Sequence, residues 1–436
     1  MTVSTPADHG ATLRRLRRVF SVGMVGNVLT LLTNFLIPPL FISALGTERY
    51  GAWLYLFTIP TSLAMFDLGV SAAFSTEVYK HHAAGDTPLA ARAFKTGVKA
   101  IGGLMGLVLL VAAGLVGWRY TVGPQAPVDV EFHVTMLLLC AYVLSGFFSE
   151  LMSSSYKIAG RYDQFQLIGL VSKAVEIGTL LALIPFNDFR LMALAMLGVR
   201  ALTMAATIAQ ALRLTPELAQ GSWRGYVPFK HLLLPSLMYA VNPLIMFIAL
   251  QVPLMVIAPS AGLTALVAYT TVRTLSRLPL QISSQISFSL YTEYTRLQAA
   301  GEHATVARLY RKGQWMIAAL FAAYALGGML LGPTVYTLWL KQLPPEFHIL
   351  FAILLFDAVF ESFMRHRICL SSSTNQHSRD TSYQFVAVCL SVGAMWAVSH
   401  WTQQLTHVLL PASAITLCAL LWGLWHDRRV MPSTRL

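Results

Sequence analysis

Long apolar stretches recur along the whole chain. Hydrophobic residues make up 56% of its 436 residues and charged residues only 11%, against about a quarter charged in soluble domains. Continuous apolar runs argue against a membrane β-barrel, whose strands alternate over short segments. We expect an all-α, polytopic membrane protein, because twelve stretches can each cross about 30 Å of hydrocarbon as a helix of about 20 residues. The twelve predicted spans are 19–43, 52–74, 97–118, 132–154, 165–185, 191–212, 234–258, 262–287, 313–334, 347–368, 383–401 and 405–425.

The chain also contains an internal repeat. Residues 75–97 align without a gap with residues 291–313, at a constant offset of 216 positions. A self-match at one fixed period indicates duplicated architecture. Six predicted spans separate the two copies, so both copies lie on the same membrane face and the pseudo-twofold axis runs along the membrane normal. The identical pairs are Thr76/Thr292, Glu77/Glu293, Ala83/Ala299, Ala84/Ala300, Gly85/Gly301, Ala91/Ala307, Arg92/Arg308 and Gly97/Gly313.

This repeat predicts two six-helix lobes. The N-terminal lobe comprises residues 1–215 with spans one to six, and the C-terminal lobe residues 234–436 with spans seven to twelve. The connecting residues 216–233 are rich in proline, glycine and basic side chains and predict a cytoplasmic linker. Two lobes joined in this way can rock around a central cavity.

The basic residues predict the orientation. With the N-terminus inside, 24 of the 31 Lys and Arg fall in inside segments, four lie outside (Arg49, Arg119, Arg190 and Lys341), and three remain within the membrane. Basic residues of short loops stay cytoplasmic, so both termini are expected in the cytoplasm. The net charge of +12 is thus a topology signal, and we expect no nucleic-acid partner because no soluble reading domain accompanies the basic clusters.

One face of the predicted eighth span is polar. Thr270, Arg273, Arg277 and Gln281 follow one another at helical spacing, which places them on a single helix face. Charges at membrane depth normally face a cavity or a partner. Two arginines one turn apart therefore suggest an anionic substrate; the alternative is an ion pair with an acid from another helix. The acids considered as ion-pair or coupling residues are Asp67, Glu150 and Glu361, and Asp357 is considered as an ion-pair partner alone.

Other polar residues are candidates for the same chamber. Arg200 is the third membrane arginine, and Asn27, Asn34 and Asn242 lie in the first and seventh spans. Arginine suits phosphate because its planar fork donates two hydrogen bonds at once, whereas amides and hydroxyls suit sugars but also serve as helix-packing contacts. Lys173 and Glu176, three residues apart, are expected to pair with each other. No catalytic residues and no metal site are predicted.

Two short motifs carry a resemblance to a known family. The chain reads Leu-Gly-Thr-Glu-Arg-Tyr-Gly over residues 45–51 and Asp-Leu-Gly over residues 67–69. With twelve spans in two like halves, it resembles the polysaccharide-exporter branch of the multidrug/oligosaccharidyl-lipid/polysaccharide (MOP) superfamily, which includes the O-antigen and exopolysaccharide repeat-unit flippases.

The resemblance implies a flippase of the bacterial inner membrane. Its substrate would be an undecaprenyl-pyrophosphate-linked oligosaccharide, moved from the cytoplasmic to the periplasmic leaflet by alternating access. It implies membrane lipids, a polysaccharide polymerase and glycosyltransferases as partners, and no cofactor apart from a coupling ion, H⁺ or Na⁺, that the sequence does not identify.

Two other function classes stay open. Multidrug or small-molecule efflux is the first alternative, although a cation exporter should gather carboxylates in its cavity and the first span, 19–43, contains none. A membrane glycosyltransferase or polymerase is the second. Such enzymes place catalytic residues in a substantial outside loop, and the longest candidate here offers only Asp129 and Glu131. We therefore expect a transporter and not an enzyme.

The orientation can be tested by cysteine labelling. In a variant without the four native cysteines, Lys341→Cys should react with a membrane-impermeant maleimide added from outside, whereas Lys312→Cys should react only after permeabilisation. Labelling of position 341 from the cytoplasmic side alone would overturn the assignment of inside and outside.

Overall fold

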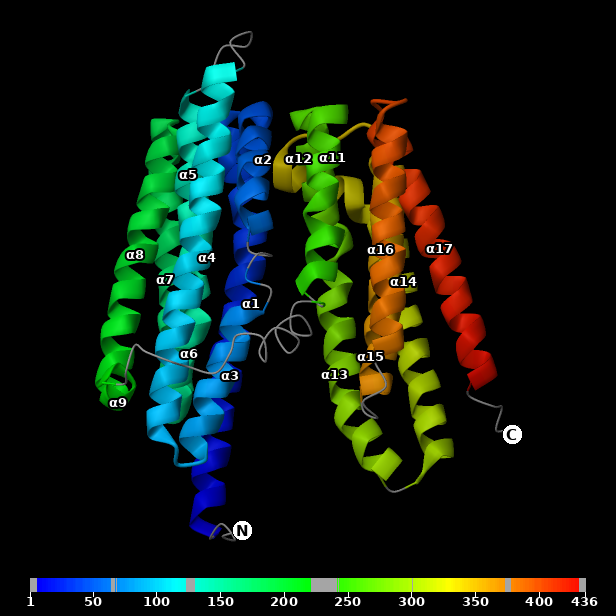
Figure 1. Ribbon diagram of the computed structural model, residues 1–436. Helices are drawn as coiled ribbons and strands as arrows, with labels where there is room; N and C mark the ends of the chain where they lie inside the picture. Colours follow the sequence, from blue (N-terminus) through cyan, green and yellow to red (C-terminus); the bar gives the residue numbers. More distant parts are fainter. Residues whose placement is uncertain are drawn as a thin grey trace. The chain divides into compact units, whose positions relative to one another are not determined.

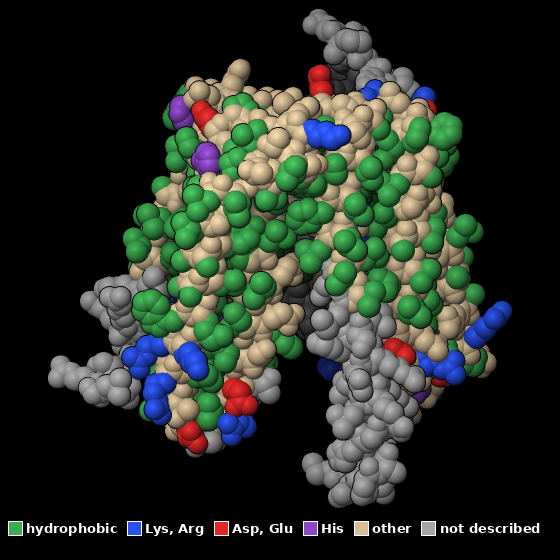
Figure 2. All heavy atoms as spheres, turned by 180° about the vertical axis from the view of Figure 1, so that it is seen from behind, with side chains coloured by type: hydrophobic (Ala, Val, Ile, Leu, Met, Phe, Trp, Pro, Cys, Tyr) green, Lys and Arg blue, Asp and Glu red, His purple; other side chains and the backbone are tan. Residues whose placement is uncertain are grey.

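The computed structural model describes residues 6–63, 67, 69–122, 130–220, 241, 243–299, 301–372 and 378–430. These residues form helices and turns and contain no strand (Figure 1). Within them, ten helical stretches are long and apolar enough to cross a membrane. On the face seen in Figure 2, hydrophobic side chains cover the middle of the helices and Lys and Arg gather toward their ends. The prediction of an all-α, polytopic membrane protein is confirmed.

The second and eighth predicted spans are the two without a counterpart among these ten stretches, and each is formed by two helices. The second consists of α2 (Thr47–Leu63) and α3 (Val70–Ala83). The eighth consists of α12 (Leu263–Ser276) and α13 (Leu278–Ala299), which meet at Arg277. Each of the twelve predicted spans therefore has a helical counterpart among the described residues.

The chain forms two compact units. The first unit comprises residues 1–45 and 56–244. Besides the last part of α2, it contains α1 (Pro6–Leu45), α3, α4 (Thr87–Val122), α5 (Val130–Ser145), α6 (Phe147–Ile158), α7 (Tyr162–Leu183), the short 3-10 helix η2 (Ile184–Phe186), α8 (Phe189–Leu214) and α9 (Pro216–Gln220). Its core includes fully buried Phe74, Leu151 and Tyr156 on α3 and α6.

The second unit comprises residues 46–55 and 245–436. It contains α11 (Val252–Ala261), α12, α13, α14 (His303–Leu340), α15 (Phe347–Ser372), α16 (Ser378–Ser399) and α17 (Leu405–Val430), with the helical residues 245–250. The start of α2 packs within this unit, where a Cβ on Gly51 would lie 2.6 Å from the Leu263 carbonyl oxygen. The sequence analysis placed residues 46–55 in the N-terminal lobe, whereas the structure places them in the second unit. Most of the predicted linker, residues 221–233, lies outside the described residues.

The repeat is visible as the same helix packing in each unit. Helix α3 packs against α4 and α6, and α13 packs against α14 and α15. At the repeated glycines the helices approach closely. A Cβ on Gly97 would lie 3.1 Å from Phe74, and one on Gly313 would lie 2.8 Å from Leu290, the residue 216 positions after Phe74. The identity of Gly97 and Gly313 therefore has a steric cause.

The repeated loops also keep their backbone conformation. Gly85 and Gly301 have φ angles of 83° and 75°, in the left-handed region that glycine adopts without steric penalty. Both glycines follow the end of a helix, α3 and α13. The two copies therefore share a left-handed glycine just after a helix at equivalent positions.

The close approach at Gly313 predicts a stability effect. Gly313→Ala places a methyl group 2.6 Å from His366 Cε1, and overpacking of this kind costs about 1–3 kcal/mol, so the melting temperature of the detergent-solubilised protein should fall. Gly327→Ala on the same helix is the matched control, because a Cβ there has no neighbour within 4 Å. Equal melting temperatures for the two variants would contradict the close approach.

Candidate functional site

A buried ion pair joins α7 and α8 in the first unit. Glu176 is 4% exposed, and its carboxylate lies 2.9 Å from Nε of Arg200. The Tyr142 hydroxyl of α5 donates to the same carboxylate at 2.7 Å and accepts from Arg200 at 2.8 Å. Ser172 adds a fourth contact at 3.2 Å. The Glu176 carboxylate is therefore satisfied entirely from within this unit.

The expected pairing of Lys173 with Glu176 is wrong. The Lys173 ammonium instead donates to Thr30 Oγ1 of α1 at 2.8 Å, and Arg200 takes the carboxylate. The guanidinium also lies over the Tyr142 ring, 4.7 Å from its centroid, so that one arginine contacts both a charge and an aromatic face. The planar, forked guanidinium can stack on the ring while it donates to the carboxylate.

Asp67 and Glu150 are engaged locally in the first unit. Asp67 accepts from the backbone N–H and hydroxyl of Ser71, at 3.1 and 2.6 Å. Glu150 pairs with Lys157 on the same helix at 3.0 Å. These contacts are of the kind that starts or bridges helices, and neither acid is paired with one of the three membrane arginines.

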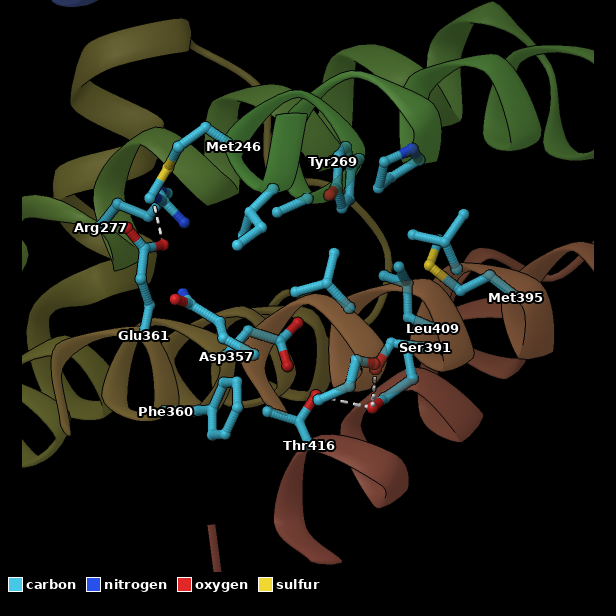
Figure 3. A pocket seen from close by; sticks show the side chains of 18 residues that line it. Met246, Tyr269, Arg277, Asp357, Phe360, Glu361, Ser391, Met395, Leu409 and Thr416 are labelled. Atoms are coloured by element: carbon cyan, nitrogen blue, oxygen red, sulfur yellow. Dashed lines mark hydrogen bonds and ion pairs between the residues drawn. The ribbon is translucent and has the colours of Figure 1, made fainter. Parts of the chain in front are cut away.

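The second unit contains a larger charged cluster. Glu361 of α15 lies 2.6 Å from Arg277, at the junction of α12 and α13, and 2.7 Å from Arg365 on its own helix. Figure 3 shows the Arg277–Glu361 pair at the edge of a cavity. Of the two interpretations that the sequence left open for Arg277, the structure thus contains the ion pair. A role in substrate binding stays a prediction.

Arg273 has neutral partners. Its Nη1 donates to the Leu250 carbonyl oxygen at 2.7 Å, and the guanidinium lies 4.9 Å from the Tyr269 ring centroid. This carbonyl is free because the chain kinks before Pro253, where the N–H of Leu254 donates to Gln251 and not to Leu250. A carbonyl released at a proline kink must find another donor in a membrane, and Arg273 supplies it.

The cavity of the second unit lies beside this cluster (Figure 3). Its volume is about 90 Å³, enough for several water molecules, since one needs roughly 10–15 Å³. Its lining is mostly apolar, with Arg277, Asp357, Glu361 and Gln384 among the polar side chains. Asp357 Oδ1 is buried and has no hydrogen-bond partner.

Of the other residues predicted in the eighth span, Thr270 and Gln281 do not line this cavity. Thr270 donates to the Val267 carbonyl oxygen at 3.0 Å, Gln281 and Asn34 are exposed, and the side chains of Asn27 and Asn242 lie outside the described structure. On the polar face of the eighth span, Arg273 and Arg277 are thus engaged within the unit and Gln281 is exposed. Their role in substrate binding stays a prediction.

Two pairings of the site were not predicted, that of Glu176 with Arg200 and that of Glu361 with Arg365, although the sequence contained signals for both. Glu176 and Arg200 are the lone acid and the lone basic residue of two consecutive predicted spans, 165–185 and 191–212, and adjacent antiparallel helices can bring such charges together. Asp357, Glu361 and Arg365 follow one another at four-residue steps, which aligns them on one helix face. No comparable signal marks Tyr142.

The Glu176–Arg200 pair should behave as a coupled unit. Removing one partner of a buried pair leaves the other charge uncompensated and costs about 3–5 kcal/mol, so Glu176→Leu and Arg200→Leu should each lower the melting temperature markedly. The double variant should be more stable than either single variant. Additive losses in this double-mutant cycle, measured in detergent, would show that the two charges do not depend on each other.

Comparisons with known proteins define the fold. No family model and no curated protein matches the chain. A multidrug resistance MATE family transporter of the MOP superfamily, in an inward-facing conformation, matches with a TM-score of 0.71, 13% identity and coverage of 95% of this chain and 97% of the other. An outward-facing transporter of the same description matches with a TM-score of 0.59 and 16% identity, over 96% of this chain and 95% of the other. The Vibrio cholerae MATE transporter VcmN in the bent form matches with a TM-score of 0.57 and 15% identity, over 97% of this chain and 98% of the other. The chain has the fold of the MATE transporters of the MOP superfamily.

Proposed function

We propose that the chain is a secondary transporter that exports amphipathic small molecules and is coupled to cation movement through the cavity of its second unit. The observation that carries this proposal is the environment of Asp357. Its Oδ1 is buried without a hydrogen-bond partner, whereas the neighbouring Glu361 is already held by Arg277 and Arg365. One acid of the cavity is thus paired with two arginines, whereas the polar neighbours of the other are the hydroxyls of Ser413 and Thr416 and the more distant Arg277.

A buried carboxylate that no arginine contacts directly favours a cation. Charges at membrane depth cost from about 2.5 kcal/mol upward, and binding H⁺ or Na⁺ to Asp357 removes most of that cost. The cation is then released when the cavity opens to water. Such a difference in affinity between two states of a transporter is what couples an ion gradient to a conformational change.

The state of the arginines favours small amphipathic molecules over pyrophosphate. Arg200 and Arg277 each have a carboxylate partner within 3 Å, so two of the three cations expected to bind an anion are already neutralised. The solved structures with the same fold include proteins described as multidrug resistance transporters. This supports the efflux alternative ahead of the flippase.

Flipping of a lipid-linked oligosaccharide is the second candidate, and Arg273 favours it. Its contacts, the Leu250 carbonyl and the Tyr269 ring, are neutral, so its positive charge stays available to a phosphate. The Leu-Gly…Tyr-Gly and Asp-Leu-Gly motifs of residues 45–51 and 67–69 point the same way. Alternating access by the two halves is common to both candidates.

One pair of variants separates the two candidates. In proteoliposomes loaded with a fluorescent lipophilic cation, a proton or sodium gradient should drive export by the native protein. Asp357→Asn should abolish the dependence on the gradient, because the amide cannot bind the cation in the same way, while Arg273→Ala should leave export within about twofold. Glu293→Gln is the control, since this exposed acid pairs with Arg296 outside the cavity.

The outcomes are distinct. Gradient-driven export at the native rate by Asp357→Asn rejects the coupling role. A native protein that moves no lipophilic cation, together with loss of cell-surface polysaccharide in Arg273→Ala at normal protein level, rejects efflux and supports the flippase.

A further inference from the structure

The first three turns of α14 carry a basic face with one aromatic residue. Arg308, Arg311, Lys312 and Trp315 are spaced by three and four residues, which aligns them along one side of the helix. All four are exposed, and Trp315 is 76% exposed. Figure 2 shows Lys and Arg side chains gathered at the lower end of the second unit, beneath its hydrophobic band.

These three cations are not neutralised by the described part of the protein. The contacts of Arg308 and Arg311 are weak, at 3.5 Å to the Thr305 hydroxyl and 3.4 Å to the Ala307 carbonyl oxygen. Among the described residues, no carboxylate forms an ion pair with Arg308, Arg311 or Lys312. The nearby acid Glu293 forms an ion pair with Arg296, at 2.8 Å. The face therefore presents a local excess of positive charge.

The same face becomes apolar directly after Trp315. Ala319, Leu326 and Leu330 continue it along α14 and are exposed, Leu326 at 65% and Leu330 at 69%. Exposed leucines on a membrane-spanning helix contact acyl chains, and tryptophan is enriched where acyl chains meet headgroups. The basic residues, one and two turns before Trp315, thus lie at the depth of the lipid phosphates.

We propose that Arg308, Arg311, Lys312 and Trp315 form a binding site for the headgroup of an anionic phospholipid in the leaflet that is expected to be cytoplasmic. The cations contact the phosphate, with the arginine forks able to donate two hydrogen bonds each. Trp315 packs beside the glycerol region, and the apolar face beyond it accommodates the acyl chains. This site is independent of the proposed transport function and uses none of the residues of the cavity.

The first repeat lacks the same arrangement. At the positions equivalent by the offset of 216, Arg92 matches Arg308, but Thr96 stands at the place of Lys312 and Lys99 at that of Trp315. Lys95, equivalent to Arg311, is buried at 7% exposure. A general rule that basic residues lie at the cytoplasmic surface would apply to both copies, whereas the exposed cluster with its tryptophan belongs to the second copy alone.

Trp315 makes the site measurable by fluorescence quenching. The full-length protein is reconstituted in phosphatidylcholine bilayers that contain phosphatidylglycerol or phosphatidylcholine brominated near the top of the acyl chains. The difference between the native protein and Trp315→Phe isolates the signal of this residue from the other tryptophans. Brominated phosphatidylglycerol should quench Trp315 at a lower mole fraction than brominated phosphatidylcholine.

The basic residues should determine this preference. Each Lys or Arg near a membrane surface contributes about 1 kcal/mol, roughly fivefold in affinity, so Arg311→Gln with Lys312→Gln should reduce the preference for phosphatidylglycerol by up to about thirtyfold. Arg92→Gln with Lys99→Gln removes the same charge from two exposed basic residues of α4 in the first repeat and should leave the preference unchanged. If the double variant does not reconstitute, Lys312→Gln alone should reduce the preference for phosphatidylglycerol by about fivefold.

Three results would overturn the proposal. Equal quenching of Trp315 by the two brominated lipids would show a solvated basic face without lipid selectivity. An undiminished preference in the Arg311/Lys312 variants would assign the selectivity to other residues. Loss of the preference on addition of millimolar inorganic phosphate would show a site for free anions instead of a lipid headgroup.

Discussion

The interior of this protein is organised by the cost of placing a charge in hydrocarbon. A charged side chain at the centre of a bilayer costs at least about 2.5 kcal/mol, so each one needs a partner, a cavity or a route to water. Arg200 meets Glu176, Arg277 meets Glu361, and Arg273 meets a carbonyl released by a proline kink. Each of these contacts also fixes how a helix is rotated against its neighbour. The charged side chains thus help to determine which helix faces pack together, because apolar contacts alone distinguish poorly between helix faces in a membrane.

Duplication explains which parts of the two units are alike and which are not. The loops and close helix contacts are shared, with Gly85 and Gly301 in left-handed conformation and Gly97 and Gly313 at tight crossings. The charged clusters differ. In the first unit one acid is satisfied by Tyr142 and Arg200, whereas the second unit holds two acids with a cavity beside them. Backbone geometry was retained in both copies while the polar chemistry diverged.

Much of the fold follows from the sequence because its determinants are local. Span positions depend on stretches of about 20 apolar residues, and the repeat depends on identities at one offset, including Gly85 and Gly301. The charge pairs depend on how each helix is rotated and on which helices are neighbours. Lys173 and Glu176 are suitably spaced on one helix, yet Glu176 turns toward Arg200 on the next. Spacing along one helix therefore predicts the wrong partner for Glu176, because the guanidinium that binds its carboxylate belongs to the neighbouring helix.

The division of α2 between the two units has a consequence for how the molecule is built. Residues 46–55 belong to the second unit, although residues 1–45 and 56–244 form the first, so the chain passes between the units three times. Cutting the chain where the two repeats join would consequently separate residues that pack within the same unit. A gene split after residue 244 would place Gly51 on one polypeptide and Leu263, against which it packs, on the other. The second unit therefore depends on residues that lie on the other side of that point in the sequence.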